Sequence, residues 1–264
     1  MAKLCPLFSG SNGNSYYIGS SGSGILIDAG RSAKQLETAM RAHSLEPSDL
    51  QAIFVTHEHA DHVQGVRVLA TRYHIPVYSS PGTLQAMEEL GILNGKFPVE
   101  AIGENGVSIC GMQVTAFPTS HDSRESVGYV VHTADGRKAA FATDLGYFSD
   151  AVFDAVLGCD AVVMESNHDV GMLQNGFYPY YLKRRILSNT GHLSNAACAG
   201  ELPALAQSGT TRFVLAHLSR ENNLPQLAYQ TALCSLQTCG MQEGLDFQLM
   251  VAPPENLGEK AVLF

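Results

Sequence analysis

Apolar runs too short to form helices recur along the chain, and they are rich in β-branched and aromatic residues. Such runs are typical of buried strands. They predict strands over residues 15–18, 24–27, 52–55, 77–79, 113–117, 128–132, 139–142, 161–164, 212–215 and 247–251. Apolar residues at helical spacing predict helices over residues 32–43, 62–73, 82–90, 195–207 and 225–238, with Ser32 and Asn195 as the expected caps.

Both halves of the chain alternate strands with helices, and no linker rich in Pro, Gly or Ser separates them. This pattern predicts an α/β protein with two sheets packed face to face and helices outside, a four-layer α/β/β/α sandwich. The chain has 264 residues, of which 45% are hydrophobic, so a sizeable core is available. We expect a single domain over residues 1–264.

The charge and the cysteines of the chain limit its expected partners and cellular location. The net charge of −9 argues against a protein that coats nucleic acid through bulk charge, although a local basic groove remains open. The chain opens without a secretory signal, and no apolar run approaches the roughly 20 residues of a membrane span. The six cysteines are scattered without a Cys-x-x-Cys pair. We therefore expect reduced thiols, a cytoplasmic location and no membrane partner.

One motif carries most of the chemistry. Residues 57–62 read His-Glu-His-Ala-Asp-His and follow the apolar run at 52–55. Imidazole and carboxylate are preferred ligands of zinc and related divalent ions. A tight loop after a strand can turn His57 and His59 to one metal, and Asp61 and His62 to a second. The alternative is a polar surface loop that happens to be rich in histidine, but such clusters do not normally follow a core strand without a role.

Three further strand ends carry candidate ligands, namely His121, Asp144 and His217. Taken alone, each has an ordinary structural interpretation as a capping Asp or a hydrogen-bonded His at a strand end. Active sites in layered α/β proteins collect where several strand ends converge. Three apolar runs ending in His, Asp and His fit that geometry, so we expect these side chains to join the first motif.

In this order the motifs resemble the metallo-β-lactamase superfamily, over the whole chain. The resemblance implies two divalent ions, Zn²⁺ or Mn²⁺, with a bridging hydroxide as the nucleophile. It implies a first ion held by His57, His59 and His121. It implies a second ion held by Asp61, His62 and His217, with Asp144 bridging. Asp28, after the run at 24–27, resembles the Asp that the superfamily places beneath the metal loop to support a ligand histidine, although it could simply form a turn.

Two of these positions narrow the chemistry within the superfamily. Asp144 stands where true β-lactamases usually carry Cys, and a bridging carboxylate suits in-line phosphoryl displacement. His59 stands where the diiron oxidoreductases carry Glu, and this ligand set favours Zn²⁺ or Mn²⁺ over a redox iron pair. Together they indicate a phosphodiesterase.

The segment Thr190-Gly191-His192-Leu193-Ser194-Asn195 resembles an element of the RNase Z and RNase J branches. In those branches the His lies beside the scissile phosphate and acts as a charge stabiliser or proton donor. Glu165, at the end of the run at 161–164, matches the Glu that RNase Z relatives orient onto that His. The candidate catalytic residues are therefore Asp61, His192 and Glu165. The candidate substrate contacts in this segment are Ser194 and Asn195. The alternative for His192 is a residue at the start of a helix.

Residues 178–185 combine three tyrosines with Lys183, Arg184 and Arg185, which suits base stacking and phosphate binding. The alternative is a helix with a solvated basic face. His168 follows Glu165 by three positions, and the sequence leaves its role open.

Five segments together resemble the YycJ/WalJ subfamily, namely residues 8–15, 27–30, 165–169, 191–195 and 217–223. That resemblance implies a stand-alone nuclease, a 5′-to-3′ exonuclease on double-stranded DNA. A thioester or ester hydrolase of the glyoxalase II kind is the first alternative, because it would share all seven ligands without needing a Glu165–His192 pair. The second is a binding module that keeps the fold without catalysis. The sequence leaves open the native metal, DNA versus RNA, exo- versus endonuclease action, and the oligomeric state.

Overall fold

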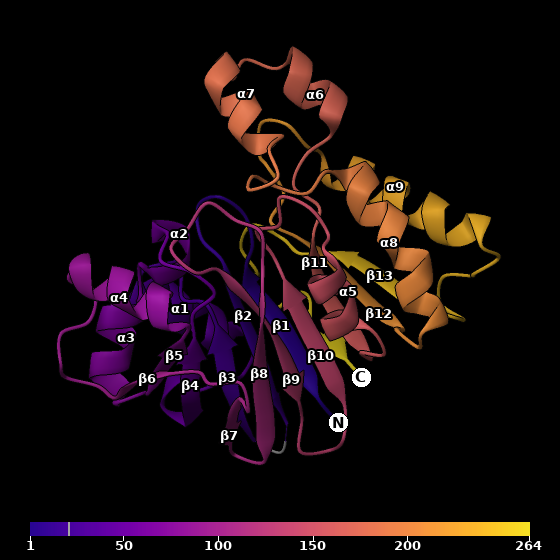
Figure 1. The fold of residues 1–264 in the computed structure, drawn as a ribbon. Helices are drawn as coiled ribbons and strands as arrows, with labels where there is room; N and C mark the ends of the chain where they lie inside the picture. The colour runs from indigo at the N-terminus through magenta and orange to yellow at the C-terminus, as the bar shows by residue number, and fades with distance from the viewer. Residues whose placement is uncertain (21) are drawn as a thin grey trace. The chain divides into compact units, whose positions relative to one another are not determined.

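The computed structural model describes residues 1–20 and 22–264 (Figure 1). The chain divides into two compact units. The first unit comprises residues 1–116, 123–137 and 253–264. The second comprises residues 117–122 and 138–252. The expected single domain over residues 1–264 stays a prediction.

The first unit contains a mixed sheet of order β14-β1-β2-β3-β4-β5-β6. Its strands are β1 (Lys3–Phe8), β2 (Ser15–Ser20), β3 (Ser23–Ile27), β4 (Leu50–Phe54), β5 (Val77–Ser79), β6 (Val99–Ala101) and β14 (Val262–Leu263). β3, β4, β5 and β6 pair in parallel, whereas β1 pairs antiparallel with both β2 and β14. Parallel pairing brings the carboxyl ends of β3 and β4 to one edge, where their loops carry Asp28 and His57.

Three more strands begin in this unit, namely β7 (Val107–Ile109), β8 (Met112–Pro118) and β9 (Val127–His132). β9 packs against the first sheet through aromatic rings. The centroids of Tyr129 and Phe54 lie 5.5 Å apart in an edge-to-face arrangement, and Phe54 stacks on Tyr78 at 5.0 Å. The hydroxyl of Tyr129, fully buried, donates a hydrogen bond to the carbonyl of Val55 at 2.5 Å. Two sheets therefore pack face to face, as predicted.

Helices cover the other face of the first sheet. The helical segments of this unit are α1 (Ala33–Ala42), η1 (Pro47–Asp49), α2 (Ala60–Val63), α3 (Val66–Tyr73) and α4 (Pro81–Glu89). Leu36 and Met40 of α1 join Leu69 of α3 in one buried cluster with Leu26 and Ile53 of the strands. Removing such side chains from water stabilises the fold by about 1.5–3 kcal/mol each, so this layer anchors the strands that precede the metal-binding motif.

The helix expected over residues 62–73 is two helices, α2 and α3, separated at Gly65. The amide of Gly65 donates to the carbonyl of Ala29, and a Cβ at this position would lie 2.2 Å from the carbonyl oxygen of Arg31. The close approach of two backbones thus requires glycine here. The break lets α2 present Asp61 and His62 in a turn of its own.

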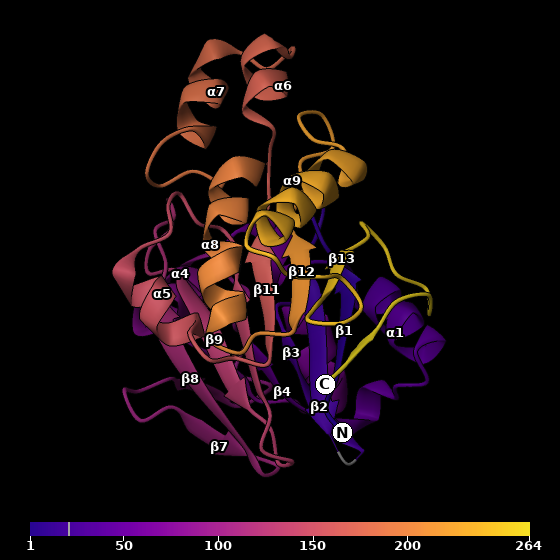
Figure 2. The same cartoon turned by 90° about the vertical axis from the view of Figure 1, so that its right-hand side faces the viewer.

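The second unit is built on four parallel strands in the order β10-β11-β12-β13. They are β10 (Lys138–Ala142), β11 (Ala161–Glu165), β12 (Arg212–Ala216) and β13 (Gln248–Val251). Its helices are α5 (Asp150–Val156), α6 (Val170–Asn175), α7 (Tyr180–Ile186), α8 (Asn195–Gln207) and α9 (Pro225–Thr238). α8 and α9 pack on each other and cover a face of β11–β13 (Figure 2).

The α/β class with two packed sheets and helices is confirmed, but several elements were missed. The missed strands include β1, β6 and β7, whose apolar runs are short or interrupted by Pro6. The missed helices are α5, α6 and α7, which bury too few residues to show a helical spacing of apolar positions. The expected cap of α8 was wrong, because the hydroxyl of Ser194, not Asn195, accepts the hydrogen bond from the amide of Ala197. No helix among the described residues is both long and apolar enough to cross a membrane.

Candidate metal centre and catalytic site

In the first unit, Asp28 organises the loops after β3 and β4. Its Oδ1 accepts a hydrogen bond from the amide of Thr56 at 2.8 Å, and its Oδ2 lies 2.8 Å from Nδ1 of His62. Both acidic and imidazole side chains are fully buried. A carboxylate on Nδ1 fixes the ring so that Nε2 is the nitrogen available to a metal. The position of Asp28 thus matches the supporting role that the sequence suggested.

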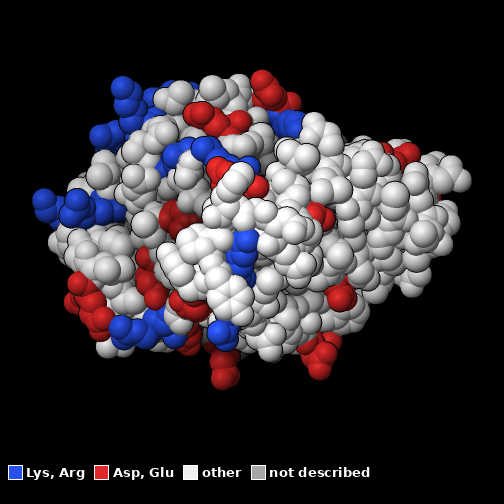
Figure 3. All heavy atoms as spheres, turned by 90° about the horizontal axis from the view of Figure 1, so that it is seen from above, with Lys and Arg blue, Asp and Glu red and all other residues white. Residues whose placement is uncertain are grey.

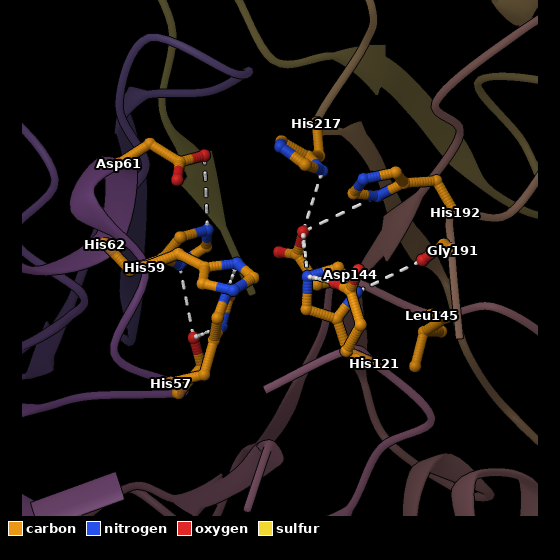
Figure 4. A network of polar contacts seen from close by, with 12 residues as sticks. His57, His59, Asp61, His62, His121, Asp144, Leu145, Gly191, His192 and His217 are labelled. Carbon is orange, nitrogen blue, oxygen red and sulfur yellow. Dashed lines mark hydrogen bonds and ion pairs between the residues drawn. The ribbon is translucent and has the colours of Figure 1, made fainter. Parts of the chain in front are cut away.

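The side chains of His57, His59 and Asp61, from the His-Glu-His-Ala-Asp-His motif, gather beside His62 (Figure 4). Nε2 of His57 lies 3.1 Å from Nδ1 of His59, and Oδ2 of Asp61 lies 3.6 Å from Nε2 of His62. His59 directly precedes α2, and Asp61 and His62 lie on this short helix. A helical turn, and not the expected tight loop, therefore directs these two side chains. Nitrogen and oxygen donors collected at these distances are the chemistry of a divalent cation site.

Asn14 is a member of this cluster that the sequence did not single out. Its Nδ2 lies 3.1 Å from Nε2 of His62 and 3.4 Å from Oδ2 of Asp61. The loop that holds it is anchored at Gly30, since the amide of Gly30 donates to the carbonyl of Asn14. The only sequence feature that could have indicated Asn14 is the glycine-rich segment at 8–15, which was interpreted as a tight turn. A hollow of ≈730 Å³ opens in this unit beside His59 and Asp61.

In the second unit, the ends of β10 and β12 place Asp144 and His217 together, and Figure 4 shows the carboxylate of Asp144 directed toward His217 and His192. Oδ1 of Asp144 lies 3.2 Å from Nδ1 of His217 and 3.6 Å from Nδ1 of His192. Oδ1 of Asp144 also lies 3.8 Å from Nε2 of His121. The three predicted strand-end ligands of this unit are therefore neighbours.

Glu165, at the end of β11, lies at the centre of this group. Its Oε1 lies 2.9 Å from Nδ1 of His192 and 2.7 Å from Nδ1 of His217, closer than Asp144 lies to either nitrogen. Its Oε2 accepts hydrogen bonds from the amides of Leu145 at 2.7 Å and Leu193 at 3.1 Å. Burial raises the pKa of Glu165, but the charges of the His192 and His217 imidazoles and their hydrogen bonds to Glu165 outweigh burial and hold the pKa well below its usual range.

The sequence indicated Glu165 as the partner of His192, and the structure adds His217 as a second partner. One buried carboxylate thus orients a proposed catalytic imidazole and a proposed metal ligand. With Nδ1 of each ring facing Glu165, Nε2 is the outward nitrogen of both His192 and His217.

His121 is oriented by backbone rather than by a carboxylate. Its Nδ1 lies 3.1 Å from the carbonyl oxygen of Gly191, in the segment that carries His192. Burial lowers the pKa of His121, although the Asp144 carboxylate opposes this effect. A neutral imidazole is the form that ligates a metal, so burial favours the ligating state.

Three site residues share an unusual backbone conformation. Asp28, Asp144 and His217 have φ values of 61°, 59° and 55°, and each follows a strand end. The left-handed region costs a residue other than glycine about 1–2 kcal/mol. Such strain is kept at functional sites, where it turns a side chain sharply out of the strand direction. Residue spacing carries no sign of this conformation.

Two asparagines support the His217 loop without having been singled out. Nδ2 of Asn167 donates to the carbonyl of His217 at 2.8 Å, and Nδ2 of Asn223 donates to the carbonyls of Ser166 and Asn167 at 2.9 Å. Asn195 is part of the same network. It is 3% exposed, and its Oδ1 accepts from the hydroxyl of Ser166 at 2.7 Å. The amide of Asn195 thus contacts the loop in this structure, and the substrate contact expected of Asn195 stays a prediction.

The basic run lies on α7, next to α6 in both ribbon views (Figures 1 and 2). Nζ of Lys183 donates to the carbonyl of Gln174 at 2.8 Å, and Arg184 lies 5.9 Å from the ring centroid of Tyr180. Arg185 forms two hydrogen bonds with the carboxylate of Asp122, at 2.5 and 2.8 Å. Arg185 is thus tied to the residue that follows His121, whereas Arg184 remains on an exposed face.

Comparison with known proteins identifies the family. A profile of the Beta-lactamase superfamily domain matches residues 24–218. This chain belongs to the beta-lactamase superfamily. It is 39% identical over 255 residues to the exodeoxyribonuclease YycJ of Bacillus anthracis, covering 94% of each chain. It is 37% identical over 258 residues to the exodeoxyribonuclease WalJ of Streptococcus pneumoniae, covering 96% of this chain and 95% of the relative.

Solved structures support the same superfamily fold. The metallo-beta-lactamase fold protein YhfI of Bacillus subtilis matches with a TM-score of 0.73 at 14% identity, covering 99% of this chain and 98% of that one. The short form of human tRNase Z matches with a TM-score of 0.63 at 18% identity, covering 99% and 98%. The resemblance to the superfamily and to its YycJ/WalJ members, inferred from the motifs, is confirmed.

Replacing Asp28 with asparagine should lower metal affinity by about 10- to 100-fold, the usual effect of removing a group that orients a ligand. An amide nitrogen in place of Oδ2 would face Nδ1–H of His62, donor against donor, and would favour the wrong tautomer. Titration of the metal-free protein with Zn²⁺ measures the effect. Asp49→Asn, outside these loops, is the control and should titrate like wild type. Equal affinities for the two variants would remove Asp28 from the site.

Proposed function

We propose that this chain is a metal-dependent phosphodiesterase that acts on DNA, as a 5′-to-3′ exonuclease on double strands. The observation that carries the proposal is the buried Glu165, which holds His192 beside Asp144 and His217. A thioester hydrolase has no need of this arrangement. Similarity to named exodeoxyribonucleases over nearly the full chain supports the choice of DNA. The six free cysteines fit a cytoplasmic location.

We propose two divalent ions, Zn²⁺ or Mn²⁺, held by the seven residues that the superfamily pattern implies. These are His57, His59 and His121 for one ion, and Asp61, His62 and His217 for the other, with Asp144 shared. The donor chemistry of the described clusters fits such ions, and one possible group lies wholly in the second unit. When bound, the ions would activate a water molecule and neutralise charge on the phosphate.

His192 supplies the proton in this proposal. Glu165 accepts the hydrogen bond from Nδ1 of His192, so Nε2 is left to carry a proton outward. The negative charge of Glu165 stabilises positive charge on the imidazole. A proton at Nε2 would pass to the 3′ oxygen as it leaves phosphorus, and the products would end in a 3′ hydroxyl and a 5′ phosphate.

The decisive assay incubates the purified protein with Mn²⁺ or Zn²⁺ and end-labelled single- and double-stranded DNA and RNA, with a thioester in parallel. Double-stranded DNA should be shortened from its 5′ ends, faster than RNA, and the thioester should persist. Hydrolysis of the thioester alone would indicate the glyoxalase II-like function. Metal binding without turnover of any substrate would indicate a non-catalytic binding module.

Metal content should be two ions per chain under saturating conditions, because seven ligands exceed the four of one tetrahedral ion. Elemental analysis of the dialysed protein measures the ratio. Asp144→Ala should lower it, since a shared ligand is lost, whereas Asp150→Ala on α5 should not. A ratio of one in the wild-type protein would contradict the binuclear assignment.

Replacing Lys183 and Arg184 with alanine should weaken DNA binding and flatten its salt dependence. Each phosphate contact contributes roughly 0.9 to the slope of log affinity against log salt, so the slope should fall by up to about two. Figure 3 shows blue and red side chains interspersed on the face seen from above, so local groups rather than bulk charge must provide such contacts. Arg185 is left intact because it holds Asp122.

The control is Lys34→Ala with Lys96→Ala, which removes the same charge from two exposed positions of the first unit. Fluorescence anisotropy with a labelled duplex at several salt concentrations gives both slopes. If both double variants keep the wild-type slope, α7 has only a solvated basic face.

A further inference from the structure

A small pocket of ≈250 Å³ lies beside His192 within the second unit. Its wall is largely apolar and aromatic, with Tyr147 and Phe148 from the loop after β10 and Leu187 from the end of α7. The ring of Phe148 is supported by Phe153 of α5, at 6.4 Å between centroids. Tyr147 is 48% exposed. Two aromatic side chains at a pocket mouth can stack on a flat ligand.

His168 marks the pocket as a binding site. It lines the pocket and is 1% exposed, yet neither ring nitrogen has a hydrogen-bond partner among the described residues. Its carbonyl accepts from the amide of Asn195, and its backbone bridges to Ser194, so the ring is held at a fixed place. A buried imidazole without partners is costly, and native proteins rarely keep one unless something binds it.

The charge of the lining argues against a phosphate or other anion. Neither Lys nor Arg is among the residues that line the pocket, and Glu201 contributes a carboxyl group. Burial lowers the pKa of His168 to about 4, so its imidazole is neutral near pH 7 and offers one donor and one acceptor. The lining therefore suits an uncharged, flat ligand whose edge carries both donors and acceptors. A nucleobase has these properties.

We infer that this pocket holds the unpaired base of the terminal nucleotide, the one that carries the leaving 3′ oxygen. The inference rests on the proposed function, because it uses His192 as the proton donor to that oxygen. His192 lines the same pocket, so the base of the departing nucleotide would lie next to the group that protonates it. A pocket of ≈250 Å³ has room for one base but not for a stacked pair. The last base pair of the duplex must therefore open before cleavage.

The first test changes the substrate and leaves the protein as it is. Duplexes that differ only at the 5′-terminal nucleotide carry a normal matched base, a mismatched base or an abasic analogue. Release of the first nucleotide should be fastest from the mismatched end, which opens at least cost. Release from the abasic end should be roughly 10-fold slower or more than release from the matched end, because the stacking and edge contacts of the base are lost. Equal rates from the abasic and matched ends would overturn the inference.

The second test fills the pocket. Ala197 lines it from the first turn of α8, so Ala197→Leu should remove the preference for a base over the abasic analogue. The matched control is Ala196→Leu, one residue earlier on the same exposed turn and outside the lining, which should keep the wild-type preference. An Ala197→Leu protein that keeps the preference would exclude this pocket. If the variant fails to fold by circular dichroism, the abasic comparison decides.

The two tests separate this inference from the function on which it rests. If the wild-type protein cleaves DNA but does not distinguish the abasic end, the pocket assignment fails and the exonuclease assignment stands. If the wild-type protein cleaves no DNA, both the proposed function and the pocket assignment are wrong.

Discussion

Replacing Asp61 with alanine should abolish hydrolysis while leaving the fold intact. The side chain of Asp61 is 26% exposed and lies in the first turn of α2, so its loss removes little buried surface. In the proposed site it is a metal ligand, beside Nε2 of His62 at 3.6 Å. Losing such a ligand should cost several kcal/mol of transition-state stabilisation, or roughly 10³-fold or more in rate.

The matched control for Asp61→Ala is Glu58→Gln, in the same motif. Glu58 accepts a hydrogen bond from the amide of Arg124, which a glutamine can still accept. We expect this variant to retain most of the wild-type rate on labelled duplex DNA. Circular dichroism and thermal unfolding establish that both variants are folded. Near-wild-type turnover by a folded Asp61→Ala protein would remove Asp61 from the metal centre.

Replacing His192 with alanine should lower the rate by about 10²–10⁴-fold, the range for a positioned proton donor or charge stabiliser. Metal content should not change, because His192 is not one of the seven proposed ligands. A phosphodiester with a very good leaving group should be much less affected, because such a group needs no proton. Single-turnover rates on DNA and on a chromogenic phosphodiester give the comparison.

Two results would contradict the role of His192, namely loss of a metal ion on substitution and equal slowing of good and poor leaving groups. Glu165→Gln gives a further contrast. Because Glu165 contacts both His192 and His217, this variant should slow proton transfer and also weaken metal binding. His192→Ala should do only the first. Elemental analysis of both variants distinguishes the two effects.

The fold could be predicted as far as its apolar pattern reached. Parallel strands such as β11 and β12 are buried on both faces and are read as continuous apolar runs. Helices α6 and α7 bury only Leu173 and Ile186, so they leave no amphipathic signal. The break at Gly65 could not be predicted from local sequence either, because its cause is the distant backbone of Ala29 and Arg31.

The candidate site, like the fold, could be predicted only in part from the sequence. Residue type and order were enough to suggest the ligands, because His, Asp and His follow strand ends in the superfamily order. The sharing of Glu165 between two imidazoles could not be predicted, since it depends on how β10, β11 and β12 align in the sheet. The same holds for the hydrogen bonds of Asn195 with Ser166 and Asn223. Polar side chains reveal their partners only when the chain is folded.

The most direct test of the account is the identity of the products from duplex DNA cleaved in ¹⁸O-labelled water with Mn²⁺ present. Attack at phosphorus with departure of the 3′ oxygen should release nucleoside 5′-monophosphates in order from the 5′ end. Every released nucleotide after the first should carry one ¹⁸O atom in its phosphate, which mass spectrometry detects. Products that end in 3′ phosphates, or intact DNA alongside rapid thioester hydrolysis, would contradict the account.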